Sequence, residues 1–267
     1  MTRRVHAVLL VGSLLVVTPL AAHDTWLLPD SMRVPVGSKV MLALTSGMAF
    51  PVDDFAINAK RVTRADVRLN GITAKLDAPV PGQLSLRYQW TPRAAGIAAF
   101  AVELAPKTLV LEPEKIEEYF LDINASKALR AAWDSIKAPK QWRESYAKHA
   151  ASFIRVGQPV SDSSWQNPIG MGFELVPEDD PTQIRAGQTL RVRALRNGVA
   201  VAGLEIGLQF ESDKNVLFVT TDRGGRAVMN MPKAGRWLLH ATSLRRTQRP
   251  GLEWESNFAT ITLAVAR

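Results

Sequence analysis

The sequence predicts a mainly β fold, with two antiparallel β-sandwich regions of the immunoglobulin-like or prealbumin-like kind and a helical insertion between them. Short segments alternate apolar and polar residues on both sides of the insertion, and Asn-Gly pairs at Asn70 and Asn197 are typical of tight hairpin turns. Near Pro113 the apolar spacing changes to that of a helix. We therefore divide the chain into a signal peptide (1–22), an N-terminal β-sandwich region (23–112), a helical insertion (113–153) and a C-terminal immunoglobulin-like β-sandwich region (154–267).

The strands are predicted from alternation and from the turns that separate them. In the N-terminal region they fall within residues 39–44, 65–74, 84–90 and 93–104. In the C-terminal region they fall within residues 189–195, 203–210, 221–231, 235–242 and 258–265. Several short strands at this spacing favour a sandwich over a parallel sheet wrapped by helices.

The insertion is predicted to be helical because its apolar residues recur three and four positions apart. Pro113 suits a first helical turn, and Ile116, Tyr119 and Phe120 follow at helical spacing. Residues 126–137 predict a second helix. A stripe over 141–153 predicts a third, formed by Trp142, Tyr146, Ala150 and Phe153.

The N-terminus has the pattern of a secretory signal peptide. Arg3 and Arg4 precede an apolar run at 8–17, and small residues lead to Ala22. We expect cleavage after Ala22, a mature chain that starts at His23, and a periplasmic or secreted location. The alternative is an uncleaved membrane anchor. No later segment is long and apolar enough to span a bilayer, so we expect no membrane span after cleavage.

Composition narrows the chemistry. The chain has no cysteine, which excludes disulfides, thiolate ligands and a thiol nucleophile. Its net charge is +8, but the basic residues are not interleaved with aromatic ones, so we expect no nucleic-acid partner. Because no Gly-x-Ser-x-Gly or phosphate-binding loop is present, we expect no enzyme activity.

The strongest candidate site is the expected mature N-terminus. A free His23 would offer an α-amine and an imidazole, which together can chelate one metal ion, and Asp24 could add an oxygen. His240 or His149, the other histidines after residue 22, could supply the third nitrogen of a copper or nickel site. The alternative is that His23 simply begins a strand.

The other candidates have structural interpretations. The helical prediction places His149 on a solvated face, and His240 lies in phase with Leu238 on a strand, which favours a partly buried, hydrogen-bonded side chain. The methionines are scattered without a copper-binding repeat, so core packing explains them better; they include Met41, Met48, Met171, Met229 and Met231.

Five segments together resemble one known family. They are residues 23–29 (HDTWLLP), 143–150 (RESYAKHA), 174–193 (beginning ELVP), 221–227 (TDRGGRA) and the pair 235–239 with 255–263. Their order and content are similar to those of domain of unknown function 4198, a periplasmic family grouped with the periplasmic component of nickel and cobalt uptake systems. The resemblance implies metal transport and a membrane transporter component as partner.

Three functions remain as hypotheses. The first is a non-enzymatic periplasmic protein that binds nickel, cobalt or copper and assists a nickel or cobalt importer. The second is a carbohydrate or adhesion module that uses surface tryptophans such as Trp26 or Trp165. The third is a copper oxidase built on the N-terminal histidine.

Overall fold

The computed structural model describes residues 23–137, 139–158, 162–211 and 213–267, so the expected signal peptide lies outside the described residues. Three β-sheets and two short helices make up this part of the chain. The predicted mainly β class with antiparallel sheets is therefore confirmed. No helix in the described ranges has the length and apolar character needed to cross a membrane.

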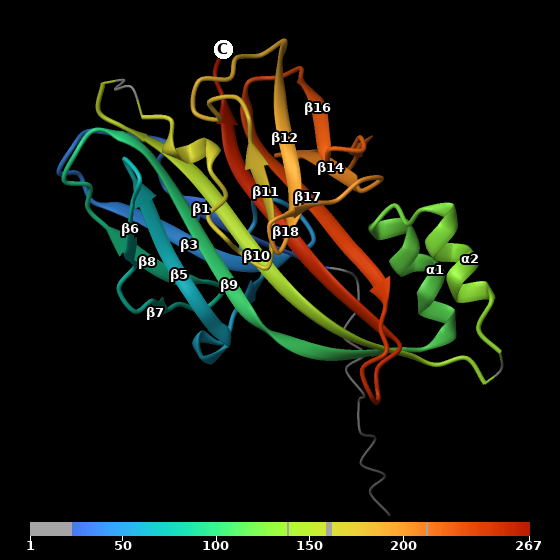
Figure 1. Cartoon of the computed structure of the whole chain (residues 1–267). Helices are drawn as coiled ribbons and strands as arrows, with labels where there is room; N and C mark the ends of the chain where they lie inside the picture. Colours follow the sequence, from blue (N-terminus) through green and yellow to red (C-terminus); the bar gives the residue numbers. More distant parts are fainter. Residues whose placement is uncertain (1–22, 138, 159–161, 212) are drawn as a thin grey trace, which may run out of the picture.

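A nine-stranded sheet forms the centre of the molecule (Figure 1). Its strands are antiparallel neighbours except that β10 lies parallel to β18 and to the short β2. In spatial order the sheet contains β15 (Val216–Thr220), β14 (Glu205–Phe210), β17 (Gly235–Arg246), β18 (Trp254–Val265), β10 (Trp142–Val156), β9 (Gly96–Leu111), β5 (Val62–Leu69) and β6 (Ile72–Lys75), with β2 (Arg33–Val34) beside β10.

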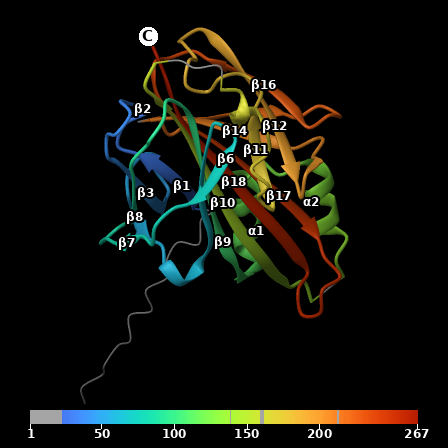
Figure 2. The same ribbon diagram turned by 60° about the vertical axis from the view of Figure 1, so that its left-hand side comes forward.

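Two smaller sheets pack on this central sheet (Figure 2). The five-stranded sheet contains β1 (Asp24–Pro29), β3 (Val40–Gly47), β8 (Leu86–Trp90) and β7 (Val80–Pro81), with β4 (Phe55–Ala56) paired to β3. The four-stranded sheet contains β11 (Phe173–Pro177), β12 (Gln188–Arg196) and β13 (Val199–Ala200), with β16 (Arg226–Met231) paired to β12. Single 3₁₀ turns lie at η1 (Ala59–Arg61) and η2 (Ser164–Gln166).

The two smaller sheets lie on opposite faces of the central sheet, and β9 and β10 serve both cores. Ala99 and Phe153 belong to the core under the four-stranded sheet, whereas Phe100 and Ile154 belong to the core under the five-stranded sheet. Successive side chains of a strand point to opposite faces, so these strands are apolar on both sides. This explains why residues 97–102 form a continuous apolar run without alternation.

The prediction of a helix over 141–153 is wrong, because these residues form the long strand β10. The stripe from Trp142 to Phe153 has helical spacing by coincidence: a strand buried on both faces places apolar residues at odd and even positions alike. Pairing to β9 on one side and β18 on the other settles the conformation. The other two predicted helices are confirmed as α1 (Pro113–Asp122) and α2 (Lys127–Asp134).

The helices cover one end of the central sheet (Figure 1). Their apolar residues pack on an aromatic cluster that includes Trp142 and Trp254, whose rings stack at 4.5 Å. Within this cluster the buried Glu144 carboxylate accepts hydrogen bonds from the Tyr119 hydroxyl (2.9 Å), the Trp142 indole (2.8 Å) and the Ser256 hydroxyl. Burial raises the pKa of Glu144 despite these three donors.

Candidate functional site

The candidate site lies at the beginning of β1, where the described chain starts. β1 is the edge strand of the five-stranded sheet, and it packs against β10 and β18 of the central sheet. Asp24 pairs with Gly47 of β3. Two positions further along, Trp26 lies on the same face of β1 and packs against Leu238 of β17, so this face of the strand looks toward β17.

Side chains from the central sheet hold the outer edge of β1. Lys148 Nζ donates to the His23 carbonyl (2.5 Å), Thr260 Oγ1 to the carbonyl of residue 25 (2.6 Å) and Thr262 Oγ1 to the carbonyl of residue 27 (2.5 Å). These three carbonyls alternate along one edge of the strand, the edge that β3 does not use. The first residues of β1 are thus fixed to the central sheet by three hydrogen bonds.

Asp24 meets His240 of β17 at this point. The distance from Asp24 Oδ2 to His240 Nδ1 is 3.3 Å, and both side chains are largely buried. A charge-assisted hydrogen bond would bring these atoms to about 2.8 Å. The two atoms are farther apart than that and are close enough to contact one metal ion together.

Gly207 makes room for the His240 imidazole. The two residues are cross-strand partners in β14 and β17, and a Cβ atom at position 207 would lie 2.2 Å from His240 Nε2. This nitrogen is buried and has no hydrogen-bond partner within the described part of the chain. The Phe218 ring, centred 6.0 Å from the imidazole, closes the other side. The ring is therefore held with Nδ1 toward Asp24.

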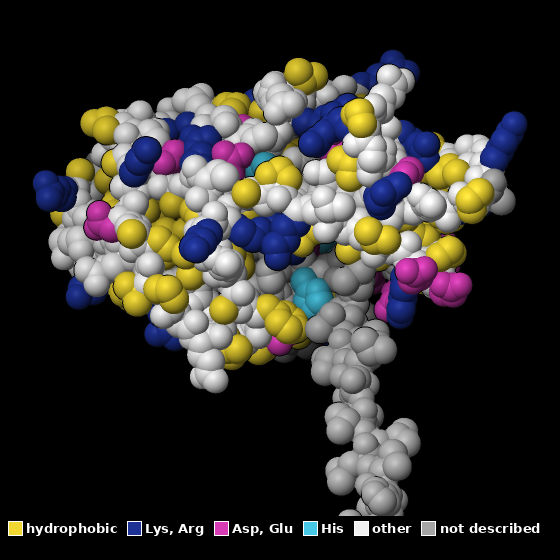
Figure 3. All heavy atoms as spheres, turned by 90° about the horizontal axis from the view of Figure 1, so that it is seen from below, with side chains coloured by type: hydrophobic (Ala, Val, Ile, Leu, Met, Phe, Trp, Pro, Cys, Tyr) yellow, Lys and Arg dark blue, Asp and Glu magenta, His cyan; other side chains and the backbone are white. Residues whose placement is uncertain are grey.

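A pocket of about 390 Å³ opens beside this pair. Figure 3 shows the face on which histidine reaches the surface among apolar side chains. The lining combines ligand-type and apolar groups, among them Asp24, Met48, Asp122, Gln209, Phe218 and His240.

His23 itself lies next to β4. Its ring meets the Phe55 ring edge-on at 4.9 Å, and its Nε2 is buried with no hydrogen-bond partner among the described residues. The imidazole thus has a nitrogen that no described residue uses. The ring packs on Phe55, and His23 is not among the residues that line the pocket with Asp24 and His240.

Lys148 is a site residue that the sequence analysis missed. Its ammonium is buried beside the Tyr146 and Phe258 rings, with centroids at 5.9 and 5.7 Å. Burial lowers the pKa of Lys148 to about 8, although the Asp24 charge acts to raise it. Alternation along β10 is the signal that could have identified this lysine. When the segment is recognised as a strand, Lys148 and Ala150 are expected on the same face, which packs against β1.

His149 lies on the other face of the central sheet, away from His240. The prediction that it is solvated on a helix is wrong, because it is buried on β10. Its Nδ1 is 3.0 Å from Glu103 Oε1 and its Nε2 is 3.0 Å from Asn257 Oδ1, so both ring nitrogens are engaged. The structure brings Asp24 and His240 together and leaves His149 outside this group.

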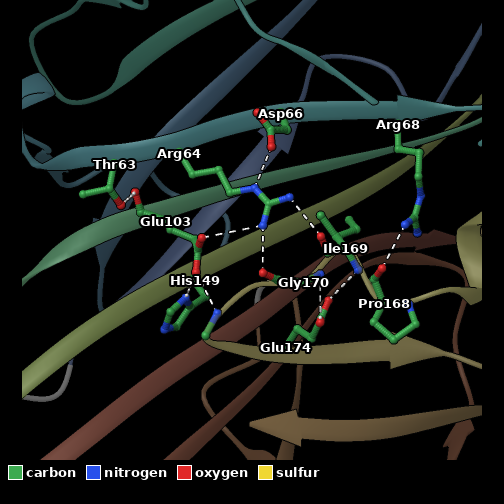
Figure 4. A network of polar contacts seen from close by, with 11 residues as sticks. Thr63, Arg64, Asp66, Arg68, Glu103, His149, Pro168, Ile169, Gly170 and Glu174 are labelled. Atoms are coloured by element: carbon green, nitrogen blue, oxygen red, sulfur yellow. Dashed lines mark hydrogen bonds and ion pairs between the residues drawn. The ribbon is translucent and has the colours of Figure 1, made fainter. Parts of the chain in front are cut away.

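The surroundings of His149 form a polar network that fastens the loop before β11 (Figure 4). Arg64 donates to the carbonyls of residues 169 and 170, both at 2.9 Å, and Glu174 accepts from the amides of the same residues. Burial acts to raise the pKa of Glu103, but hydrogen bonds from His149 and the Gly172 amide, with the Arg64 charge, hold it below its usual range. This network links β5, β9 and β11.

Among the described residues, no group of three or more His, Cys, Asp or Glu side chains is arranged to hold a metal ion. The Asp24–His240 pair therefore needs a further donor of another kind. The tryptophans considered for carbohydrate contact, Trp26 and Trp165, are buried.

Comparison with known proteins identifies the family of this chain. The described chain is a mainly β protein built of antiparallel sheets. It belongs to the family described as domain of unknown function DUF4198, whose model matches residues 20–244. No curated protein matches the chain.

Similar solved structures include the adhesin InvE of Yersinia pseudotuberculosis, with 11% identity, a TM-score of 0.25 and coverage of 89% of this chain and 58% of that one. The chain thus spans under two thirds of the InvE structure. Murine CEACAM1b is similar at 11% identity and a TM-score of 0.21, with coverage of 91% and 98%. At these TM-scores the likeness carries no functional conclusion.

Proposed function

We propose that the mature chain is an exported, non-enzymatic protein that binds a transition-metal ion at its N-terminus. Asp24 and His240 are the side-chain donors, and His23 contributes the α-amine that cleavage after Ala22 would create. The observation that carries the proposal is the Asp24 Oδ2–His240 Nδ1 distance of 3.3 Å beside an open pocket, at the start of the described chain.

The missing donor is supplied by processing of the chain. Cleavage after Ala22 would create an α-amine on His23, next to the Asp24–His240 pair. This amine and the His240 imidazole are nitrogen donors of the kind that suit nickel, cobalt and copper. The side chains at this position alone do not complete a site, so metal binding would depend on cleavage.

The surroundings of the pair also favour a metal site. Gly207 leaves room for the His240 ring, whose Nδ1 lies 3.3 Å from Asp24 Oδ2. The bond from Lys148 to the His23 carbonyl holds the terminal residue in place. Together with the family's grouping, this supports a role as an accessory to nickel or cobalt uptake, with a membrane transporter component as partner.

The test compares mature protein starting at His23 with protein carrying one extra glycine before it. Intact mass first establishes the N-terminus, and isothermal titration with Ni(II), Co(II) and Cu(II) at neutral pH then gives the affinities. The extension converts the amine into an amide, so we expect affinity to fall at least about tenfold, and a similar loss in His240→Ala. Equal affinities for native and extended protein would refute the proposed site.

A further inference from the structure

The methionines of this chain separate into two kinds. Met171, Met229 and Met231 are buried in the core under the four-stranded sheet, as a packing role requires. Met48, by contrast, has 52% of its surface exposed and lines the same pocket as Asp24 and His240. The prediction that methionines are core residues thus holds for the first group and does not account for Met48.

The backbone fixes the place of Met48. Gly47, the residue before it, pairs with Asp24 across β3 and β1, which puts the two Cα atoms within about 5.5 Å. A side chain at position 47 would lie 2.9 Å from the Trp26 ring and 3.0 Å from Asp54 Cβ, so the chain leaves β3 closely packed on β1. The long, flexible thioether of Met48 therefore emerges beside the first residues of β1.

We infer that the pocket also takes copper and that Met48 is its ligand for Cu(I). This inference rests on the proposed function, because it uses the same pocket. Thioethers are soft ligands that favour Cu(I), while an imidazole serves copper in either oxidation state. Nickel(II) and cobalt(II) gain little from a thioether. A pocket with a carboxylate, an imidazole and a thioether can hold copper in both oxidation states.

The exposure of Met48 fits a ligand better than it fits packing. A thioether at the surface contributes little to the core, and it remains mobile enough to turn toward an ion. Its neighbours in the pocket include the hydrophobic Phe218.

The test is an anaerobic competition titration of Cu(I) against bicinchoninate, with the mature protein and its Met48→Leu variant. Leucine keeps the size and apolar character of the side chain and removes the sulfur. We expect Cu(I) affinity to fall at least about tenfold, with Ni(II) affinity changed less than about twofold. The matched control is Met41→Leu, a half-buried methionine roughly 20 Å away along β3, which should change neither value.

The outcomes separate this inference from the proposed function. A Cu(I) affinity that falls less than tenfold in Met48→Leu would overturn the role of Met48, even if the N-terminal extension still weakens Ni(II) binding. X-ray absorption at the copper edge gives a second measurement, since the Cu(I) protein should show a sulfur neighbour that Met48→Leu lacks. Equal spectra for the two proteins would also overturn it.

Discussion

Gly207→Ala should displace the His240 imidazole and weaken metal binding without unfolding the protein. The added methyl group would lie 2.2 Å from His240 Nε2, more than 1 Å inside a normal contact of about 3.4 Å. The same methyl group would lie within 3 Å of two further atoms of the imidazole, Cδ2 and Cε1, so the ring must turn or shift as a whole. Its Nδ1 would then leave the position that faces Asp24.

The expected cost follows from two opposing effects. Inserting a methylene-sized group into a packed site costs about 1–3 kcal/mol, while replacing glycine by alanine within a strand returns about 0.5–1 kcal/mol of backbone entropy. We therefore expect the free energy of unfolding to fall by about 1–2 kcal/mol. A shift of the ligand atom by about 1 Å exceeds what a metal site tolerates, so Ni(II) or Cu(II) affinity should fall at least about tenfold.

A double-mutant cycle with His240→Ala tests this reasoning. Urea denaturation gives the free energy of unfolding of each single variant, the double variant and the parent protein, and metal titration gives the affinities. With the imidazole gone, Gly207→Ala should be neutral or slightly stabilising, so the coupling energy should be about 1 kcal/mol or more. An equal destabilisation by Gly207→Ala in both backgrounds would show that the imidazole does not need the space at position 207.

Three further predictions concern buried polar groups. Lys148→Met should raise the free energy of unfolding at pH 7 by about 1–2 kcal/mol, because burial lowers the pKa of Lys148 from 10.5 to about 8. The unfolded state therefore binds the lysine proton more tightly than the folded state does. In denaturant titrations the gain from Lys148→Met should shrink as pH rises from 8 toward 10.5. Tyr119→Phe should cost about 1–3 kcal/mol, measured in the same way, and the cost should grow as pH rises through the pKa of Glu144, which burial raises, because the ionised carboxylate then loses one of its donors. His149→Ala should lower the melting temperature but leave metal affinity unchanged, since both ring nitrogens serve the network on the far face; a loss of metal affinity would contradict that separation.

The elements that sequence analysis predicted well are those with one buried face. In β16, positions 227, 229 and 231 are buried and the positions between them are exposed, so alternation identifies the strand directly. Helix α1 likewise buries Ile116, Tyr119 and Phe120 along one stripe. The error over 141–153 arose because β10 is buried on both faces, which removes the signal on which the distinction between helix and strand depends.

The candidate site was predicted only as a set of residue types. Sequence analysis selected His23, Asp24 and His240, but the approach of Asp24 to His240 depends on β1 packing across the central sheet, a contact between opposite ends of the chain. Gly207 carried a readable signal, since glycine inside an alternating strand often marks the close approach of another group. Lys148 carried one as well, but only after β10 is recognised as a strand.

In the proposed site, the attachment of β1 would hold an N-terminal His23 in place as a ligand. Terminal residues usually fray, and ordering each one costs about 1–2 kcal/mol of conformational entropy. In this protein the carbonyls of residues 23, 25 and 27 are bound by side chains of the central sheet, so that cost is met during folding. An ion bound at the proposed site would meet donors already in place, which favours affinity. Burial of the Lys148 ammonium lowers its pKa and costs stability, while the same group donates to the His23 carbonyl. Positioning of His23 therefore explains this lysine better than a contribution to stability does.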